Sequence, residues 1–287
     1  KIFLNKNKVD LISMHGQTIS HINRIKSIQL GNPKYLSKIF NVPVVYDFRS
    51  KDIRLGGNGA PLVPFLDWLL LKDSTENNIT LNLGGISNIT YLPKKSSRNN
   101  VVGFDTGPGM CLIDEYVFKI FKLNYDKDGQ LASKGKVSNE LLSYLMLNDF
   151  INIKHPKSTS REDFGKTYIS NMLKKFNNVD TYDILRTLVE FTAESINKNI
   201  GFLIGPKIEY NLIVSGGGAN NKFLLSIIKN KIGKNKIFNS DILNVNIDNK
   251  EALLMAVMGY SKHNNINNNM PSVTGAKKYA VYGKIYE

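Results

Sequence analysis

The most informative stretch of the sequence reads Gly103-Phe104-Asp105-Thr106-Gly107-Pro108-Gly109. It joins an apolar run, Val101 to Asp105, to a glycine-rich turn and then to an apolar stripe at helical spacing that starts at Met110. A carboxylate that ends a strand beside free backbone amides lies where phosphate oxygens bind, and it can take a proton from a nucleophile or hold a metal. The alternative is a turn in which Asp105 caps the next segment.

Short apolar runs with glycine and proline punctuation predict alternating strands and helices around this stretch. We expect strands at 9–14, 24–30, 42–46, 80–83, 86–92, 101–105 and 210–215, and helices at 33–40, 62–71, 110–121, 185–196, from 220 onward and at 250–262. The strands between 80 and 105 follow one another closely, so antiparallel connections are expected among them. Strands followed by alternating helices and strands indicate a mixed α/β architecture.

The length of 287 residues allows one or two domains. We place a boundary near Asn78, between an N-terminal domain at 1–78 and a C-terminal domain at 79–287, with the last helix packing back onto the first domain. The chain enters a predicted strand soon after Lys1, and we therefore expect its true N-terminus to be missing. A single cysteine, Cys111, rules out a disulfide within the chain, and with four histidines it disfavours a dedicated zinc site.

The formal net charge of +14 raises the question of a nucleic-acid partner. The lysines are spread along the chain beside abundant asparagine and isoleucine, which favours a compositional bias over a clustered nucleic-acid site. No apolar stretch approaches the roughly 20 residues of a membrane helix, and residues 1–10 carry no apolar signal core. We therefore expect a cytoplasmic protein that binds neither nucleic acid nor membrane.

Two more glycine-rich motifs follow predicted strands. Ser215-Gly216-Gly217-Gly218 precedes a predicted helix, and its glycines would let a nucleotide approach the backbone closely. Its spacing is neither that of dinucleotide folds nor that of a Walker loop, and a plain glycine turn is the alternative. Asn82-Leu83-Gly84-Gly85-Ile86-Ser87-Asn88 predicts a hairpin whose flanking asparagines could point into a ligand site.

Polar residues gather after the strands of the first block, where open α/β sheets bind ligands. They are His15-Gly16-Gln17-Thr18, Gly31-Asn32-Pro33 and Asp47-Phe48-Arg49 with Asp52. Such donors and acceptors suit a hydroxyl-rich sugar, although Arg49 and Asp52 could instead form a weak surface pair. Pro156 to Glu162 is a polar loop that could contact anions, or a solvated loop in which Thr159 or Ser160 caps a helix.

In their order along the chain, nine motifs resemble those of the anhydro-N-acetylmuramic acid kinase family, from about Val9 to Tyr286. They are His15–Thr18, Gly31–Pro33, Asp47–Arg49, Gly59–Leu62, Asn82–Thr90, Phe104–Gly109, Pro156–Thr159, Gly216–Ala219 and Thr274–Ala276. The resemblance implies an α/β fold of two domains with mixed sheets around a cleft. This is the actin-like, sugar-kinase (ribonuclease H-like) architecture, shared with the seventy-kilodalton heat-shock proteins.

The resemblance also implies a cytoplasmic, homodimeric enzyme of peptidoglycan recycling that uses ATP and Mg²⁺. It would open the 1,6-anhydro ring of anhydro-N-acetylmuramic acid and phosphorylate O6 to give N-acetylmuramic acid 6-phosphate. Asp105 matches the family's catalytic base. The nucleotide-binding candidates are Gly84, Gly85, Gly107, Gly216, Gly217 and Gly218, and the substrate-binding candidates are His15, Asn32, Arg49, Asn88 and Glu251.

The sequence departs from the family pattern in four places. The family's opening Gly-Thr-Ser-x-Asp-Gly run, which cradles the ATP phosphates, has no counterpart in the sequence. Met110 replaces an asparagine, Ser160 a glycine and Asn220 an arginine. The alternative to an active kinase is therefore a fragment or decayed homologue that binds the sugar without catalysis.

Overall fold

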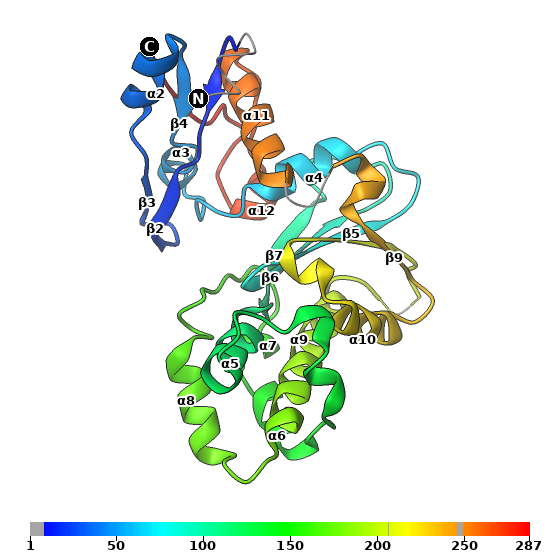
Figure 1. The fold of residues 1–287 in the computed structure, drawn as a ribbon. Helices are drawn as coiled ribbons and strands as arrows, with labels where there is room; N and C mark the ends of the chain where they lie inside the picture. Colours follow the sequence, from blue (N-terminus) through cyan, green and yellow to red (C-terminus); the bar gives the residue numbers. More distant parts are fainter. Residues whose placement is uncertain (1–8, 206, 246–248) are drawn as a thin grey trace. The chain divides into compact units, whose positions relative to one another are not determined.

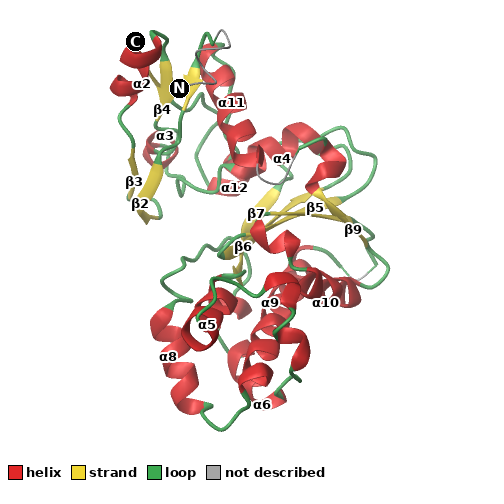
Figure 2. Ribbon diagram, in the orientation of Figure 1, coloured by secondary structure: helices red, strands yellow, loops and turns green. Residues whose placement is uncertain are grey.

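The computed structural model describes residues 9–205, 207–245 and 249–287. Strands and helices divide between two compact units (Figures 1 and 2). Unit 1 comprises Lys1–Ser74, Lys95–Val102 and Asn249–Glu287, and unit 2 comprises Thr75–Lys94 and Gly103–Asp248. Both units contain strands and helices, which confirms the predicted α/β class.

Unit 1 is built on a three-stranded sheet in the order β1-β4-β10. β1 (Ile12–Ser13) pairs in parallel with β4 (Val44–Tyr46), and β10 (Lys284–Tyr286) pairs antiparallel with β4. β2 (Gln17–Ile22) and β3 (Lys26–Leu30) form a separate antiparallel sheet. The helices of unit 1 are α2 (Pro33–Phe40), α3 (Ser50–Arg54), α4 (Val63–Leu71), α11 (Lys250–His263) and α12 (Pro271–Thr274).

The C-terminal segment belongs to unit 1, because β10 completes its sheet and α11 packs against β1, β4 and α4. We predicted continuous domains at 1–78 and 79–287. The compact units are discontinuous instead: the chain leaves unit 1 after Ser74 and returns to it at 95–102 and again at Asn249.

Unit 2 contains a five-stranded mixed sheet in the order β7-β6-β5-β8-β9. β5 (Asn78–Leu83) pairs antiparallel with β6 (Ile86–Leu92) and in parallel with β8 (Asn211–Ser215), and β9 (Lys236–Asn239) runs parallel to β8. β7 (Val102–Pro108) forms the other edge and carries Asp105. The hairpin expected at Gly84-Gly85 is confirmed as the β5–β6 connection.

The longest helix of unit 2, α9 (Thr181–Leu203), is the one against which most of the others pack, and Figure 1 shows them grouped around it. It contacts α5, α6, α7 and α10, and it buries the whole predicted stripe of Leu185, Leu188, Val189, Thr192 and Ile196. The other helices are α5 (Cys111–Phe121), α6 (Asn139–Met146), α7 (Asp149–Asn152), α8 (Lys166–Lys175) and α10 (Lys222–Ile232). Short 3₁₀ turns occur at Lys127–Gly129, Ala132–Lys134, Gly217–Asn220 and Ser240–Leu243.

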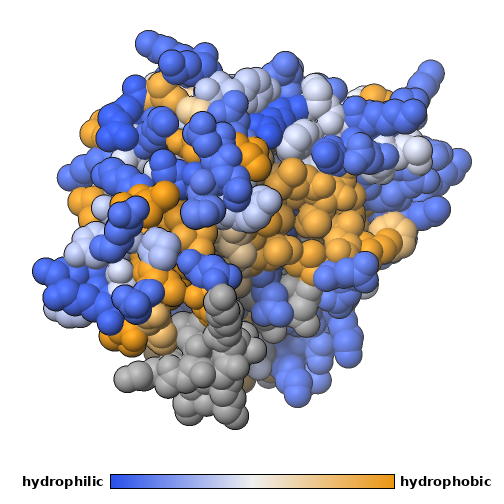
Figure 3. Space-filling view, turned by 90° about the horizontal axis from the view of Figure 1, so that it is seen from above, coloured by the Kyte–Doolittle hydropathy of each residue, from blue (hydrophilic) through white to orange (hydrophobic). Residues whose placement is uncertain are grey.

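Apolar side chains also reach the surface. On the face drawn in Figure 3, hydrophobic areas lie among hydrophilic residues. Large exposed apolar side chains include Ile25, Leu30 and Tyr35 of unit 1. Across the described ranges, no helix combines the length and apolarity needed to cross a membrane.

The segment after Asp105, which comprises the last residues of β7 and Gly109, is held by buried polar side chains of α9. Ser195 Oγ donates a hydrogen bond to the Thr106 carbonyl at 2.6 Å, and Asn199 Nδ2 donates to the same oxygen at 3.2 Å. Thr192 Oγ1 donates to the Gly109 carbonyl at 3.1 Å. Because these donors are buried, they satisfy backbone oxygens that water cannot reach.

The other side of this segment is held by β6, where the Ser87 and Thr106 hydroxyls lie 2.5 Å apart. Between these contacts Gly107 has a φ of +134°, which side chains rarely adopt. A Cβ atom at this position would lie 2.6 Å from Ile151 Cδ1 and 2.8 Å from Ser195 Oγ. Position 107 therefore requires glycine, both because there is no room for a side chain and because of its backbone conformation.

We predict that Gly107→Ala lowers the free energy of unfolding by about 2 kcal/mol or more, because it combines overpacking with an unfavourable φ. Gly201→Ala is the matched control, since Gly201 lies in α9 with nothing within 4 Å of the added methyl group. That control should be neutral or stabilising by about 0.5–1 kcal/mol. Urea unfolding of the two variants measures both values, and equal stabilities would contradict the packing described above.

Candidate active site

Asp105 lies half-buried in the middle of β7, where the segment 157–159 runs alongside it. The prediction that the strand ends at Asp105 is wrong, because β7 continues to Pro108. The Thr159 amide donates to Asp105 Oδ2 at 2.9 Å, and the Asp105 amide donates to the Lys157 carbonyl at 3.3 Å. Burial raises the pKa of Asp105 to about 6, while the Thr159 amide and the Lys157 ammonium act in the opposite direction. The alternative in which Asp105 caps the next helix is wrong, because the N-cap of α5 is Met110.

Lys157 places a positive charge in the neighbourhood of this carboxylate. Its ammonium donates to the Phe150 carbonyl at 2.6 Å and lies 4.5 Å from the centre of the Phe150 ring. Burial lowers the pKa of Lys157 to about 8, and the Asp105 carboxylate opposes that change. At neutral pH the ammonium is still mostly charged, so it favours the ionised form of Asp105.

The loop that follows is closed by Asp163. Thr159 Oγ1 and the Ser160 amide each donate to Asp163 Oδ2 at 2.8 Å. The helix cap predicted at Thr159 or Ser160 is wrong, because α8 has Gly165 as its N-cap. Asp163 instead holds the loop so that the Thr159 amide points at Asp105.

The backbone amides expected to be free at the start of α5 are already paired. The Gly109 and Cys111 amides donate to the Gly85 carbonyl at 2.9 and 3.0 Å, and the Met110 amide donates to the Gly84 carbonyl at 2.8 Å. The sequence prediction of free amides beside Asp105 is therefore wrong. The β5–β6 turn caps α5, and a phosphate group bound here would need other donors.

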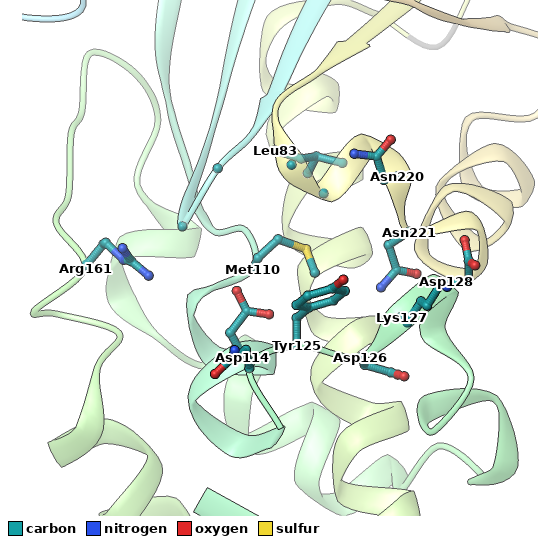
Figure 4. A pocket seen from close by; sticks show the side chains of 15 residues that line it. Leu83, Met110, Asp114, Tyr125, Asp126, Lys127, Asp128, Arg161, Asn220 and Asn221 are labelled. Atoms are coloured by element: carbon teal, nitrogen blue, oxygen red, sulfur yellow. The ribbon is translucent and has the colours of Figure 1, made fainter. Parts of the chain in front are cut away.

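A cavity of about 520 Å³ opens in unit 2 between the glycine-rich turns and α5 (Figure 4). This volume lies within the range of small-molecule sites. The backbone contribution comes from Gly84, Gly85, Gly217 and Gly218, and the side chains include Met110, Asp114, Tyr125, Asp126, Arg161 and Asn221. Figure 4 shows Asp114 and Tyr125 pointing into the space between Arg161 on one side and Asn221 on the other.

Four of the six predicted nucleotide-binding glycines thus line this cavity. Gly217 is open to it, since no atom lies within 4 Å of the position that a Cβ would take. Gly216 packs on β5 instead, where a Cβ would lie 2.8 Å from the Leu83 carbonyl oxygen. Gly107 is buried beneath α9, so packing accounts for both of the glycines that do not line the cavity.

Asp114 and Arg161 are the charged groups of the cavity that the site prediction missed. Asp114 Oδ1 is buried and makes no hydrogen bond within the described part of the chain. Burial raises the pKa of Asp114 to about 6, and the Arg161 guanidinium opposes the change. A polar residue within the otherwise apolar start of α5 was the available signal for Asp114, and the polar loop 156–162 was the signal for Arg161.

In unit 1 the structure brings His15, Arg49 and Glu251 together. Arg49 Nε donates to His15 Nε2 at 2.8 Å, and Arg49 Nη1 donates to the Gly59 carbonyl at 2.7 Å. Burial lowers the pKa of Arg49 to about 10, and the carboxylates of Asp52 and Glu251 oppose the change. A surface pair between Arg49 and Asp52 is wrong, because Asp52 is 0% exposed and its hydrogen bonds go elsewhere.

The two remaining substrate-binding candidates are Asn32 and Asn88. Asn32 is exposed and caps α2 by accepting a hydrogen bond from the Lys34 amide at 3.0 Å. Asn88 lies half-buried in β6, directly opposite Asn82 in β5. Their roles in binding a substrate stay predictions.

The sequence matches the family model described as anhydro-N-acetylmuramic acid kinase over residues 2–287. The chain belongs to this family. A relative named anhydro-N-acetylmuramic acid kinase from Caldanaerobacter subterraneus subsp. tengcongensis is 39% identical over 299 residues, covering 99% of this chain and 76% of that protein. One of the same name from Clostridioides difficile is 40% identical over 284 residues, covering 96% of this chain and 74% of that protein.

The family match confirms the resemblance drawn from the nine motifs. Among solved structures, the activator of 2-hydroxyisocaproyl-CoA dehydratase from Clostridium difficile with bound ADPNP aligns at a TM-score of 0.40 and 15% identity. It covers 70% of this chain and 67% of that chain, a likeness too low to bear on function.

We predict that Asp105→Asn stabilises the fold at neutral pH. A pKa raised from 3.8 to about 6 means that the folded state holds a proton that the unfolded state releases between these pH values. The wild-type free energy of unfolding therefore falls as pH rises from about 4 to about 6, and the variant should exceed it at pH 7 by up to about 2 kcal/mol. Thermal unfolding from pH 4 to pH 8 measures the difference, which should vanish near pH 4.

Asp163→Asn is the matched control in the same loop. Hydrogen bonds from Thr159 and Ser160 lower the pKa of Asp163, so its ionised form stabilises the folded state. This variant should be less stable than wild type at pH 7, and the difference should shrink as pH falls through the acid range. The same sign for both variants would contradict the assigned environment of Asp105.

Proposed function

We propose that this protein is an ATP-dependent kinase that opens the 1,6-anhydro ring of anhydro-N-acetylmuramic acid and phosphorylates O6, giving N-acetylmuramic acid 6-phosphate. The observation that carries the proposal is Asp105, a carboxylate of β7 that the Thr159 amide holds, in a chain of this family. The proposal includes a cytoplasmic location, a homodimer and a role in peptidoglycan recycling.

The substrate sets the chemical problem. Its bridge joins C1 to O6, so O6 is no nucleophile until the C1–O6 bond breaks. Water attacks C1 and gives its proton to a base, and the C1–O6 bond breaks. O6 then attacks the γ-phosphorus of ATP, whose bond to the bridging oxygen breaks and releases ADP. One base acting on the water therefore serves both ring opening and phosphoryl transfer.

Asp105 has the properties that this base requires. Its Oδ2 is held by the Thr159 amide, which orients the carboxylate and leaves Oδ1 to receive the proton. A pKa of about 6 leaves the group ionised at neutral pH but more basic than an ordinary carboxylate. The Lys157 ammonium favours the ionised form before the reaction.

The glycine-lined cavity of unit 2 is where we place the nucleotide. Gly217 lets a ligand approach the backbone, and Arg161 supplies a guanidinium suited to phosphate oxygens. Mg²⁺ in kinases is held by one or two carboxylates together with substrate phosphates. Asp114 fits this need, because its buried Oδ1 has no hydrogen-bond partner in the described chain; it would hold the ion, which neutralises phosphate charge when bound.

The sugar-binding candidates of unit 1 are His15, Arg49 and Glu251, which lie close enough to influence one another's charge. Arg49 offers N–H donors and Glu251 offers acceptor oxygens, which is what a sugar rich in hydroxyl groups requires. Asn32 is a further substrate-binding candidate of unit 1, and Asn88 in β6 is a candidate of unit 2.

We predict that Asp105→Asn lowers kcat for sugar phosphorylation by about 10²–10⁴-fold, because an amide cannot take the proton of the attacking water. Product formation from anhydro-N-acetylmuramic acid with ATP and Mg²⁺ measures the effect. Asp149→Asn, an exposed acid at the start of α7, is the control and should match wild type.

A kcat of Asp105→Asn equal to that of wild type would overturn the catalytic assignment. If wild type binds the sugar in calorimetry but forms no product with ATP and Mg²⁺, the kinase proposal itself fails and a binding function remains.

We also predict that Gly217→Ala raises the KM for ATP about tenfold without loss of stability. The added methyl group meets no protein atom within 4 Å, so it would project into the space assigned to the nucleotide. Gly201→Ala adds the same group outside the cavity and should leave the KM unchanged. An unchanged KM in Gly217→Ala would place the nucleotide elsewhere.

A further inference from the structure

We infer that Asp52 is a positioning residue, which fixes the turn at Gly57–Gly59 and, through this turn, the guanidinium of Arg49 on the sugar-binding side. The inference rests on the proposed function, since it takes Arg49 as a substrate-binding group.

The carboxylate of Asp52 is fully buried and accepts three hydrogen bonds. Oδ1 accepts from the Thr274 hydroxyl at 2.7 Å and from the Tyr282 hydroxyl at 2.5 Å, and Oδ2 accepts from the Gly59 amide at 2.6 Å. A buried carboxylate costs free energy unless donors bind its oxygens. Moving any of these three donors would therefore be unfavourable, and the carboxylate fixes their positions.

Gly59 transmits this constraint to Arg49. Its amide is bound to Asp52 Oδ2, and its carbonyl accepts from Arg49 Nη1 at 2.7 Å. The turn also presses closely on the acid, since a Cβ at Gly57 would lie 2.2 Å from Asp52 Oδ2. Two hydrogen bonds through one residue therefore join the buried carboxylate to the guanidinium.

The C-terminal segment supplies the other half of the arrangement. Thr274 and Tyr282 hold Oδ1, and Asn269 Nδ2 in turn donates to the Tyr282 hydroxyl at 2.9 Å. The Asn58 amide donates to the Thr274 carbonyl at 2.8 Å, so the turn is tied to the same segment directly. Asp52 thus connects its own helix α3, the 57–59 turn and the segment after α11.

His15 reports on the position of Arg49. A guanidinium only donates, so His15 Nε2 must be unprotonated where it accepts from Arg49 Nε, and Nδ1 carries the proton that the Gly16 carbonyl accepts at 2.8 Å. Burial and the Arg49 charge lower the pKa of His15, while the Gly16 carbonyl and the Glu251 carboxylate act to raise it. If Arg49 moves away, the pKa of His15 should rise and its fixed tautomer should be lost.

The test is Asp52→Asn, which keeps the size of the side chain. If the amide oxygen stays with the two hydroxyls, its NH₂ group faces the Gly59 amide, so the turn must shift and Arg49 with it. We expect the KM for anhydro-N-acetylmuramic acid to rise at least tenfold, with the KM for ATP changed less than twofold. In ¹H–¹⁵N spectra of the imidazoles, the His15 titration should move to higher pH; His15→Gln assigns the signal.

Two further variants separate positioning from general loss of stability. Leu66→Ala opens a cavity in α4 of the same unit without removing any atom of the network, so the KM for the sugar and the His15 titration should stay at wild-type values. Tyr282→Phe removes one of the three donors. It should change the KM for the sugar and the His15 titration in the same direction as Asp52→Asn, but by less.

The inference is overturned if folded Asp52→Asn keeps both the wild-type KM for the sugar and the wild-type His15 titration, or if Leu66→Ala produces the same changes. If Asp52→Asn does not fold, Tyr282→Phe decides by the same two measurements. Absence of product in wild type would overturn the proposed function and not this inference, which the His15 titration would then decide alone.

Discussion

The hydrogen bonds that α9 donates to the last part of β7 and to Gly109 are the constraint on which the rest of unit 2 depends. Ser195 and Asn199 both bind the Thr106 carbonyl, and they are buried in the helix against which α5, α6, α7 and α10 pack. The apolar stripe of α9 and this polar contact share one helix, so the packing that forms the core also holds the last part of β7 in place. Asp105 precedes Thr106 and takes its position from that same contact.

Much of the fold could be predicted because local signals and tertiary packing agree. α2 has the predicted bounds, since Asn32 caps it, Pro33 starts it and Asn41 ends it in a left-handed conformation. β2 was missed because its half-buried side chains, Thr18, Ser20 and His21, are polar, while its two isoleucines are exposed. The α5 stripe was only partly right: Ile120 is 40% exposed, while Tyr116, outside the predicted stripe, is 1% exposed. Which face of a helix is buried depends on its neighbours.

The candidate site was less predictable, because its surroundings come from distant segments. The motif at Gly103–Gly109 located Asp105, but the Thr159 amide that holds it lies 54 residues later. The sequence predicted free amides at Gly109 and Met110. In the structure, carbonyl groups of the β5–β6 turn accept hydrogen bonds from both amides. The cavity likewise assembles Asp114 of α5 with Arg161 of a later loop. Periodicity carries no information about such pairings.

Asp52 and Asp105 differ in how far their surroundings satisfy them. Asp52 accepts three hydrogen bonds, so donors satisfy both oxygens of its buried carboxylate. Asp105 has the Thr159 amide and a nearby ammonium, and burial still dominates, which raises its pKa. An acid that its surroundings satisfy serves to hold other groups in place. An acid left incompletely satisfied keeps an affinity for a proton, and a base that acts at neutral pH needs that affinity.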